Sequence, residues 1–200
     1  METTRTRRIR KLVVMAMLTA LVIVLQLISI LPINPVVGVT FALTPIVIGA
    51  ILYGEWAGAL LGAVMGIEVF IMVVTGQAGS LSTAMFQLNP VVTFLVCVLK
   101  TAIAGFLSGW LYSLLEKTGK KTLAAIVSAL VCPVVNTGLF LSALLTVFYG
   151  VADKFAEGSM VHFVFIGILG VNFILEFVIN SVASPAIARI VQVVRKNKMA

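Results

Sequence analysis

The sequence has little charge, and this shortage excludes an ordinary soluble protein. Only 10% of its 200 residues are charged, whereas 61% are hydrophobic. Soluble domains carry about a quarter charged residues, so a chain this apolar lacks the polar side chains to cover a water-facing surface. We therefore expect its natural solvent to be lipid.

Metal-binding and nucleophilic side chains are also scarce. Cys97 and Cys132 stand in apolar runs with no second cysteine or histidine at metal-ligand spacing, which predicts packing roles. His162 is the single histidine. The stretch from Gly119 to Thr122 lacks the upstream glycine of a phosphate-binding loop. We expect a protein that is not an enzyme, with no ATPase motif, no metal and no cofactor.

Long apolar runs dominate the chain instead. A helix needs about 20 residues to cross a bilayer, and six runs of about this length are separated by proline, glycine or charged turns. The predicted spans are 12–31, 36–53, 56–74, 90–115, 123–149 and 161–190. The first run is too long for the apolar region of a cleaved signal peptide. The predicted fold class is all-α: a polytopic six-helix membrane bundle in which residues 1–200 form one domain.

The breaks between the runs are short. Pro32 and Pro35 end the first run, because proline removes a backbone donor and restricts the residue before it. Gly54 and Glu55 predict a very tight hairpin between the second and third spans. Charged loops are expected at 116–121 and 153–157.

Lysine and arginine are distributed unevenly between the two predicted sides of the membrane. One side holds Arg5, Arg7, Arg8, Arg10, Lys11, Lys117, Lys120, Lys121, Arg189, Arg195, Lys196 and Lys198. The opposite side holds Lys154 alone. Because basic residues collect on the cytoplasmic side of membrane proteins, both termini and the 116–121 turn are predicted to be cytoplasmic. The loops at 32–35, 75–89 and 150–160 then face outward.

Several polar side chains fall inside the predicted spans, where they are costly unless they face a bundle interior or cavity. They are Glu68, Lys100, Asn136, Asn172, Glu176 and Asn180. At about 1.5 Å per residue, the first three lie near the midplane. We expect an outward-opening pocket for a small polar molecule, with Lys100 available to an anionic group. The alternative is structural: a buried ion pair of Lys100 with Glu68 or Glu176, and amides that join helices through hydrogen bonds.

Residues 75–89 form a long, uncharged segment that is rich in hydroxyl and amide groups. Long connections without secondary structure are often binding loops or lids. We expect Gln77, Ser82, Gln87 and Asn89 to contact a polar ligand. The alternative is an ordinary solvated loop.

Small residues recur every four positions in, or directly beside, three of the predicted spans. Gly54, Gly58, Gly62 and Gly66 form the longest stripe, which predicts close approach of another helix without saying which one. Shorter pairs are Ala16 with Ala20 and Gly105 with Gly109.

Taken in order, these features resemble the substrate-binding (S) components of energy-coupling factor (ECF) vitamin transporters. The resemblance covers residues 8–190. It is carried by the basic N-terminus leading into Ala16-x-x-x-Ala20, the proline-containing stretch 43–54 followed by the glycine- and alanine-rich stretch 56–62, Asn89-Pro90, Lys100, and Asn136-Thr137.

The resemblance implies a bacterial plasma-membrane protein that captures a vitamin or related micronutrient from outside. It also implies partners: a transmembrane coupling (T) subunit, reached through Ala16 and Ala20, and two ATP-binding cassette ATPases. Stretch 40–54 and the start of the fourth span look most like the pantothenate-type branch. The substrate-binding residues are then expected to be Asn34, Gln77, Ser82, Gln87, Asn89, Lys100, Asn136, Asn172 and Glu176. The alternative is a stand-alone secondary transporter of a small polar metabolite, driven by protons through Glu68 and Glu176.

Overall fold

The computed structural model describes residues 4–29, 42–156, 158–174, 176–182 and 189, and every regular element in these ranges is a helix. Within these ranges, four segments are long and apolar enough to cross a membrane: Arg8–Ile28, Glu55–Val74, Pro90–Glu116 and Lys121–Thr146. The all-helical membrane class is therefore confirmed. The count of six spans and the side on which the termini lie remain predictions.

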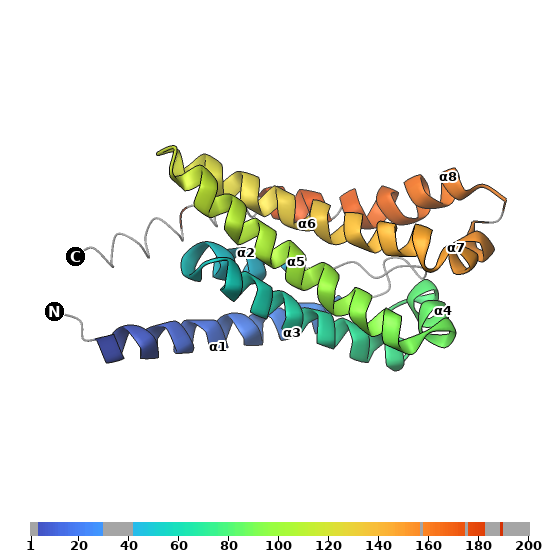
Figure 1. The fold of residues 1–200 in the computed structure, drawn as a ribbon, viewed down its shortest axis with the longest axis horizontal. Helices are drawn as coiled ribbons and strands as arrows, with labels where there is room; N and C mark the ends of the chain where they lie inside the picture. Colours follow the sequence, from blue (N-terminus) through green and yellow to red (C-terminus); the bar gives the residue numbers. More distant parts are fainter. Residues whose placement is uncertain (1–3, 30–41, 157, 175, 183–188, 190–200) are drawn as a thin grey trace.

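The long helices lie side by side and form a bundle (Figure 1). They are α1 (Thr4–Ile28), α3 (Glu55–Val74), α5 (Pro90–Glu116) and α6 (Lys121–Thr146). Helix α5 packs against α3 and also against α6. The shorter α2 (Leu43–Tyr53) contacts α1, α3, α5 and α6. Only Gly54 separates α2 from α3, and its φ of 95° is one that glycine adopts readily, which confirms the predicted tight hairpin.

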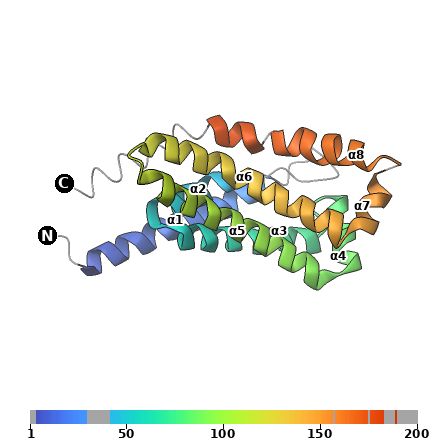
Figure 2. The ribbon, with the colours of Figure 1, turned by 45° about the horizontal axis from the view of Figure 1, so that its top comes forward.

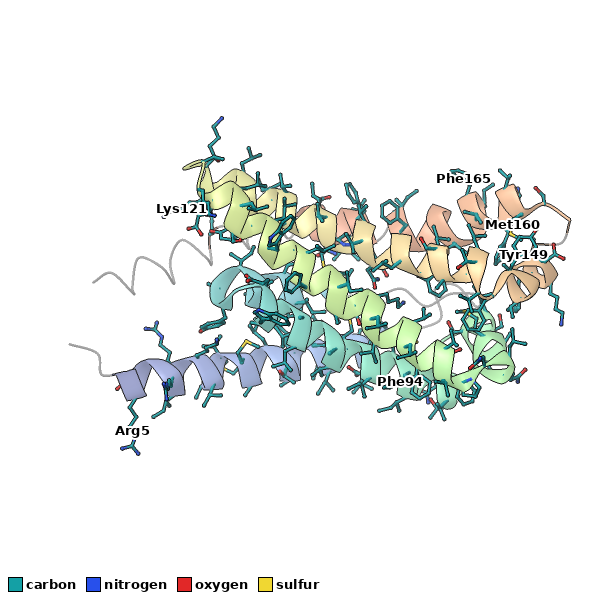
Figure 3. The ribbon with its side chains drawn as sticks, in the orientation of Figure 1. Arg5, Phe94, Lys121, Tyr149, Met160 and Phe165 are labelled. Carbon is teal, nitrogen blue, oxygen red and sulfur yellow. The ribbon has the colours of Figure 1, made fainter. Side chains whose placement is uncertain are left out.

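The two ends of the bundle differ in chemistry. The start of α1, the α2–α3 connection and the α5–α6 turn gather at one end, and Figure 3 places Arg5 and Lys121 there; we name it the basic end. The opposite end, named the α4–α7 end, carries α4 (Ser80–Leu88), α7 (Tyr149–Phe155) and α8 (Met160–His162). Tyr149 and Met160 lie at that end in Figure 3.

Two connections are more helical than expected. The segment 75–89 contains α4, because Leu81 and Met85 lie one turn apart and bury the same face. The predicted span 123–149 ends at Thr146, and the residues expected to form the next charged loop begin as α7. Helix α7 is stabilised by two of its own residues, Val151 and Ala152, whose side chains are buried.

The outer boundaries of the other predicted spans also shift. Helix α1 starts at Thr4 and so includes the basic residues before the predicted span 12–31. The described part of span 36–53 is helical from Leu43. Span 161–190 begins as α8, continues as the π-helical segment η1 (Phe163–Phe173), and is α-helical again over 176–182. Residues 30–41, 183–188 and 190 lie outside the described part.

Buried apolar side chains form two separate clusters. The inner cluster, toward the basic end, is built from α1, α2, α3, α5 and α6; its members include Leu18, Leu43, Leu61, Ala104 and Cys132. The outer cluster, toward the α4–α7 end, joins α4, α6, α7 and η1; its members include Leu81, Phe140, Phe148, Ala152 and Ile168.

The glycine stripe on α3 has a defined partner, which is α5. A Cβ atom on Gly58, Gly62 or Gly66 would collide with the backbone carbonyl oxygens of Gly105, Thr101 and Cys97, respectively. The two backbones therefore touch along three turns, which confirms the predicted close approach.

We expect Gly62→Ala to destabilise the fold by about 1–3 kcal/mol, because the added methyl group has no space against α5. Thermal unfolding in detergent measures the loss. Gly138→Ala on α6 is the matched control, since a Cβ there meets no atom within 4 Å. Equal melting temperatures for the two variants would contradict the tight contact.

Candidate functional site

A layer of polar side chains separates the two apolar clusters. On α6, Asn136 lies one turn from Cys132 of the inner cluster and one turn from Phe140 of the outer cluster. On α5, Lys100 lies one turn from Ala104 of the inner cluster and one turn from Val96, which packs against the outer cluster. Residues four apart share a helix face. On each of the two helices, the polar residue therefore lies between the residues of the inner cluster and those of the outer cluster.

The pairing of α5 with α6 places Lys100 and Asn136 at one depth. The Ser108 hydroxyl donates to the Ser128 carbonyl oxygen at 3.0 Å. The two helices are antiparallel, so eight residues from this contact on each helix lead to Lys100 and Asn136, about 12 Å farther from the basic end.

Lys100 reaches one turn farther toward the α4–α7 end. Its ammonium nitrogen lies 4.8 Å from the centroid of the Phe140 ring, within cation–π range. Among the described side chains, Lys100 forms no ion pair with Glu68 or Glu176. The described part of the structure therefore does not contain the buried ion pair that the sequence allowed as an alternative.

Glu68 enters the layer from α3. Its neighbour Gly66 packs against Cys97 on α5, so Glu68 lies about one turn beyond Lys100, close to the depth that the Lys100 ammonium reaches. Both carboxylate oxygens are enclosed, and neither has a hydrogen-bond partner within the described ranges.

Gln26 on α1 is a member of the layer that sequence reasoning missed. Its side chain is 5% exposed, and its Nε2 donates to the Met72 sulfur at 3.7 Å. Met72 lies one turn beyond Glu68 on the same face of α3. The Gln26 Oε1 atom is enclosed without a partner among the residues that the structure describes. The available signal was an amide inside the apolar run from Val22 to Leu27.

Asn136 is 4% exposed, and its Oδ1 atom is likewise enclosed without a described partner. Ser128, Cys132 and Asn136 are all buried, as expected for one stripe along α6.

The last helical segment lies alongside α6 (Figure 2) and completes the layer. Glu176 and Asn180 are buried, and the Asn180 amide donates to the Glu176 carbonyl oxygen at 2.9 Å. The Thr44 hydroxyl donates to Asn180 Oδ1 at 3.3 Å, which ties this segment to the start of α2. Glu176 lies within electrostatic range of Cys132. The side chain of Asn172 and all of Ser184 lie outside the described part.

The other predicted ligand residues lie outside this layer. Gln77, Gln87 and Asn89 are exposed at the α4–α7 end, and Ser82 is half-buried on α4. Asn89 caps α5: its Oδ1 accepts from the Val92 N–H at 3.1 Å, and Pro90 follows at the first helical position. Asn34 falls in the undescribed stretch 30–41.

A second surface lies on α1. Ala16 and Ala20 are exposed on one face, next to the exposed side chains of Leu12 and Met17. The opposite face carries Leu18 and Val22, which are buried in the inner cluster. The small-residue face is therefore not covered by any described part of the chain.

The layer has the chemistry of a binding site for a polar molecule. It offers enclosed carboxylate and amide oxygens and one ammonium group, all between apolar walls. Within the described ranges, no group of three histidine, cysteine or acidic side chains is arranged to hold a metal ion.

No curated protein matches this sequence. Residues 10–188 match the family described as "ECF transporter, substrate-specific component". That match spans the long apolar helices and the polar layer, and it agrees with the resemblance drawn from the motifs. The chain belongs to the family of substrate-specific components of ECF transporters.

Proposed function

We propose that this transport subunit captures a vitamin or related micronutrient from outside the cell, with pantothenate as the best single candidate. A separate module, consisting of a transmembrane coupling subunit and two ATP-binding cassette ATPases, then drives uptake across the bacterial plasma membrane. The membership in a family of transport subunits supports the general role; the substrate and the partner arrangement are our proposal.

The observation that carries the proposal is the enclosed polar layer. Uncompensated polar groups in a membrane protein are costly, and they mark substrate pathways and binding sites more often than passive anchors. Gln26, Glu68 and Asn136 each keep an enclosed oxygen without a partner in the described structure. A bound polar ligand supplies those partners.

Pantothenate fits this layer through its carboxylate, its amide and its two hydroxyls. We propose that Lys100 binds the carboxylate, because its ammonium group rests over Phe140 and has no carboxylate partner among the described residues. Asn136, Asn172 and Glu176 bind the amide and hydroxyls. Asn34, Gln77, Ser82, Gln87 and Asn89 contact the ligand from the outer segments.

We expect Lys100→Met to weaken pantothenate binding about 10- to 100-fold, since a hydrogen bond to a charged group contributes about 1.5–3 kcal/mol. Isothermal titration calorimetry with the purified chain measures the change. Lys154→Met is the control: it removes an exposed ammonium group at the α4–α7 end and should leave the dissociation constant unchanged. Equal affinity of Lys100→Met and the unchanged protein would refute the assignment of Lys100.

We further propose six spans with both termini in the cytoplasm. The unequal charge of the two ends supports this orientation: Arg5 and Lys121 lie at the basic end, and the α4–α7 end has Lys154. The ligand segments then face outward.

Cysteine labelling tests this orientation. In a chain with Cys97 and Cys132 replaced by alanine, we expect Asp153→Cys to react with a membrane-impermeant maleimide in intact cells. Thr118→Cys, in the α5–α6 turn, should react only after the membrane is opened. Both positions are exposed, so access of the reagent depends on the side of the membrane. The reverse labelling pattern would invert the proposed topology.

We propose that the exposed Ala16/Ala20 face of α1 docks the coupling subunit, because small side chains let another helix approach closely.

In liposomes, the chain alone should bind pantothenate but import none, and import should begin when the coupling subunit, the ATPases and ATP are supplied. Ala20→Leu should keep binding and lose most of the import. Uptake driven by a proton gradient without the module would favour the ion-coupled alternative.

A further inference from the structure

We propose that the basic end binds the phosphate headgroup of an anionic phospholipid at the seam between α1 and the end of α2, with Arg10 and Lys11 as its cationic ligands. The inference goes beyond the proposed function, because it concerns a lipid of the surrounding bilayer and not the transported molecule. It does not depend on which vitamin the polar layer binds.

The first turns of α1 concentrate positive charge. The seven positions 5–11 hold five basic residues, and the sequence of α1 contains no acidic residue to offset them. Basic side chains three or four positions apart, such as those of Arg8 and Lys11, are neighbours on the helix surface and repel each other. An external anion beside these turns therefore stabilises this end of α1.

Two of these cations meet at Tyr53, the last residue of α2. The Lys11 ammonium nitrogen lies 5.9 Å from the centroid of the Tyr53 ring, and Arg10 lies within electrostatic range of the same side chain. The register of α1 explains the contact. Met15 and Leu18 lie on the same face as Lys11 and pack in the inner cluster, so Lys11 meets the end of α2 one turn nearer the basic end.

The acidic residue of the α2–α3 hairpin does not neutralise these cations. Glu55 stands two residues after Tyr53, and within the described ranges it forms no ion pair with Arg10 or Lys11. A cation–π contact attracts an ammonium group without removing its charge. The seam therefore presents a guanidinium and an ammonium group at one ring, and both bind phosphate oxygens well.

Exposed aromatic side chains place this seam at the depth of lipid headgroups, because tryptophan and tyrosine collect at membrane–water interfaces. Both tryptophans of the chain lie toward the basic end. Trp56, three residues after Tyr53, is 75% exposed, and Trp110 is 47% exposed. A Cβ atom on Gly109 would collide with the backbone of Glu55, so Trp110 is level with the hairpin.

The side chains that follow the cations favour a lipid over a soluble phosphate. Leu12 and Val13 come directly after Lys11, and they are 69% and 52% exposed. An acyl chain attached to the bound headgroup continues along these side chains, whereas a soluble phosphate makes no use of them. Membrane orientation requires only an excess of basic residues near the span. It does not require two of them at one aromatic ring, as a headgroup site between helices does.

Native mass spectrometry of the purified full-length chain tests the site. The probe is an equimolar mixture of phosphatidylglycerol and phosphatidylcholine with identical acyl chains, added in detergent. We expect the protein to retain phosphatidylglycerol preferentially. Lys11→Gln should lower this preference about fivefold, and Arg10→Gln/Lys11→Gln should lower it by about the same factor again, since each basic residue makes a similar contribution.

The matched control is Lys117→Gln/Lys120→Gln. It removes two exposed ammonium groups from the α5–α6 turn at the same end of the bundle, so the net charge changes equally. Its lipid preference should equal that of the unchanged protein. An excess of glycerol 3-phosphate, which carries a phosphate without acyl chains, should leave phosphatidylglycerol bound.

The outcomes are decisive for the site. Retention of the two lipids in equal amounts by the unchanged protein would overturn it. An equal loss of preference in the two double variants would also overturn it, because net charge alone would then account for binding. Displacement by glycerol 3-phosphate would overturn the assignment of a lipid. Gel filtration of every variant establishes that a loss of binding is not a loss of fold.

Discussion

The backbone contact between α3 and α5 sets the position of the other parts of the structure. Gly58, Gly62 and Gly66 bring the two helices so close that no Cβ fits between them. In lipid, the hydrophobic effect adds little to helix association, and van der Waals contact between closely approaching backbones contributes more. The register of this contact determines the depth of Glu68 relative to Lys100, and the packing of α5 on α6 then places Asn136.

The polar layer depends on this scaffold because its members come from separate helices. Two clusters of almost entirely apolar side chains enclose the layer. An enclosed acceptor without a partner is costly, and the cost is greater where the surroundings have a low dielectric constant. Within the described part of the chain, Gln26, Glu68 and Asn136 keep enclosed oxygens without hydrogen-bond partners. Such groups are expected in a site that binds a polar ligand with high selectivity.

Much of the fold was predictable because the relevant signals are local. Apolar runs of membrane length, the Gly54 hairpin and the four-residue glycine spacing each depend on a few neighbouring residues, and the structure confirms them. The helical character of α4 was missed, because its two buried anchors, Leu81 and Met85, show their value only when the outer cluster covers them. Gln26 was missed because one amide in an apolar helix carries little weight until its depth is known.

The amino-acid sequence by itself determined the membrane class, the approximate positions of the long helices and the presence of Glu68, Lys100 and Asn136 within them. Hydropathy and helical periodicity suffice for that, since both are properties of single segments. Only the tertiary structure decided that α5 is the partner of the glycine stripe and that Lys100 rests on Phe140. These facts depend on the register between helices, which is set by the packing of side chains far apart in the chain.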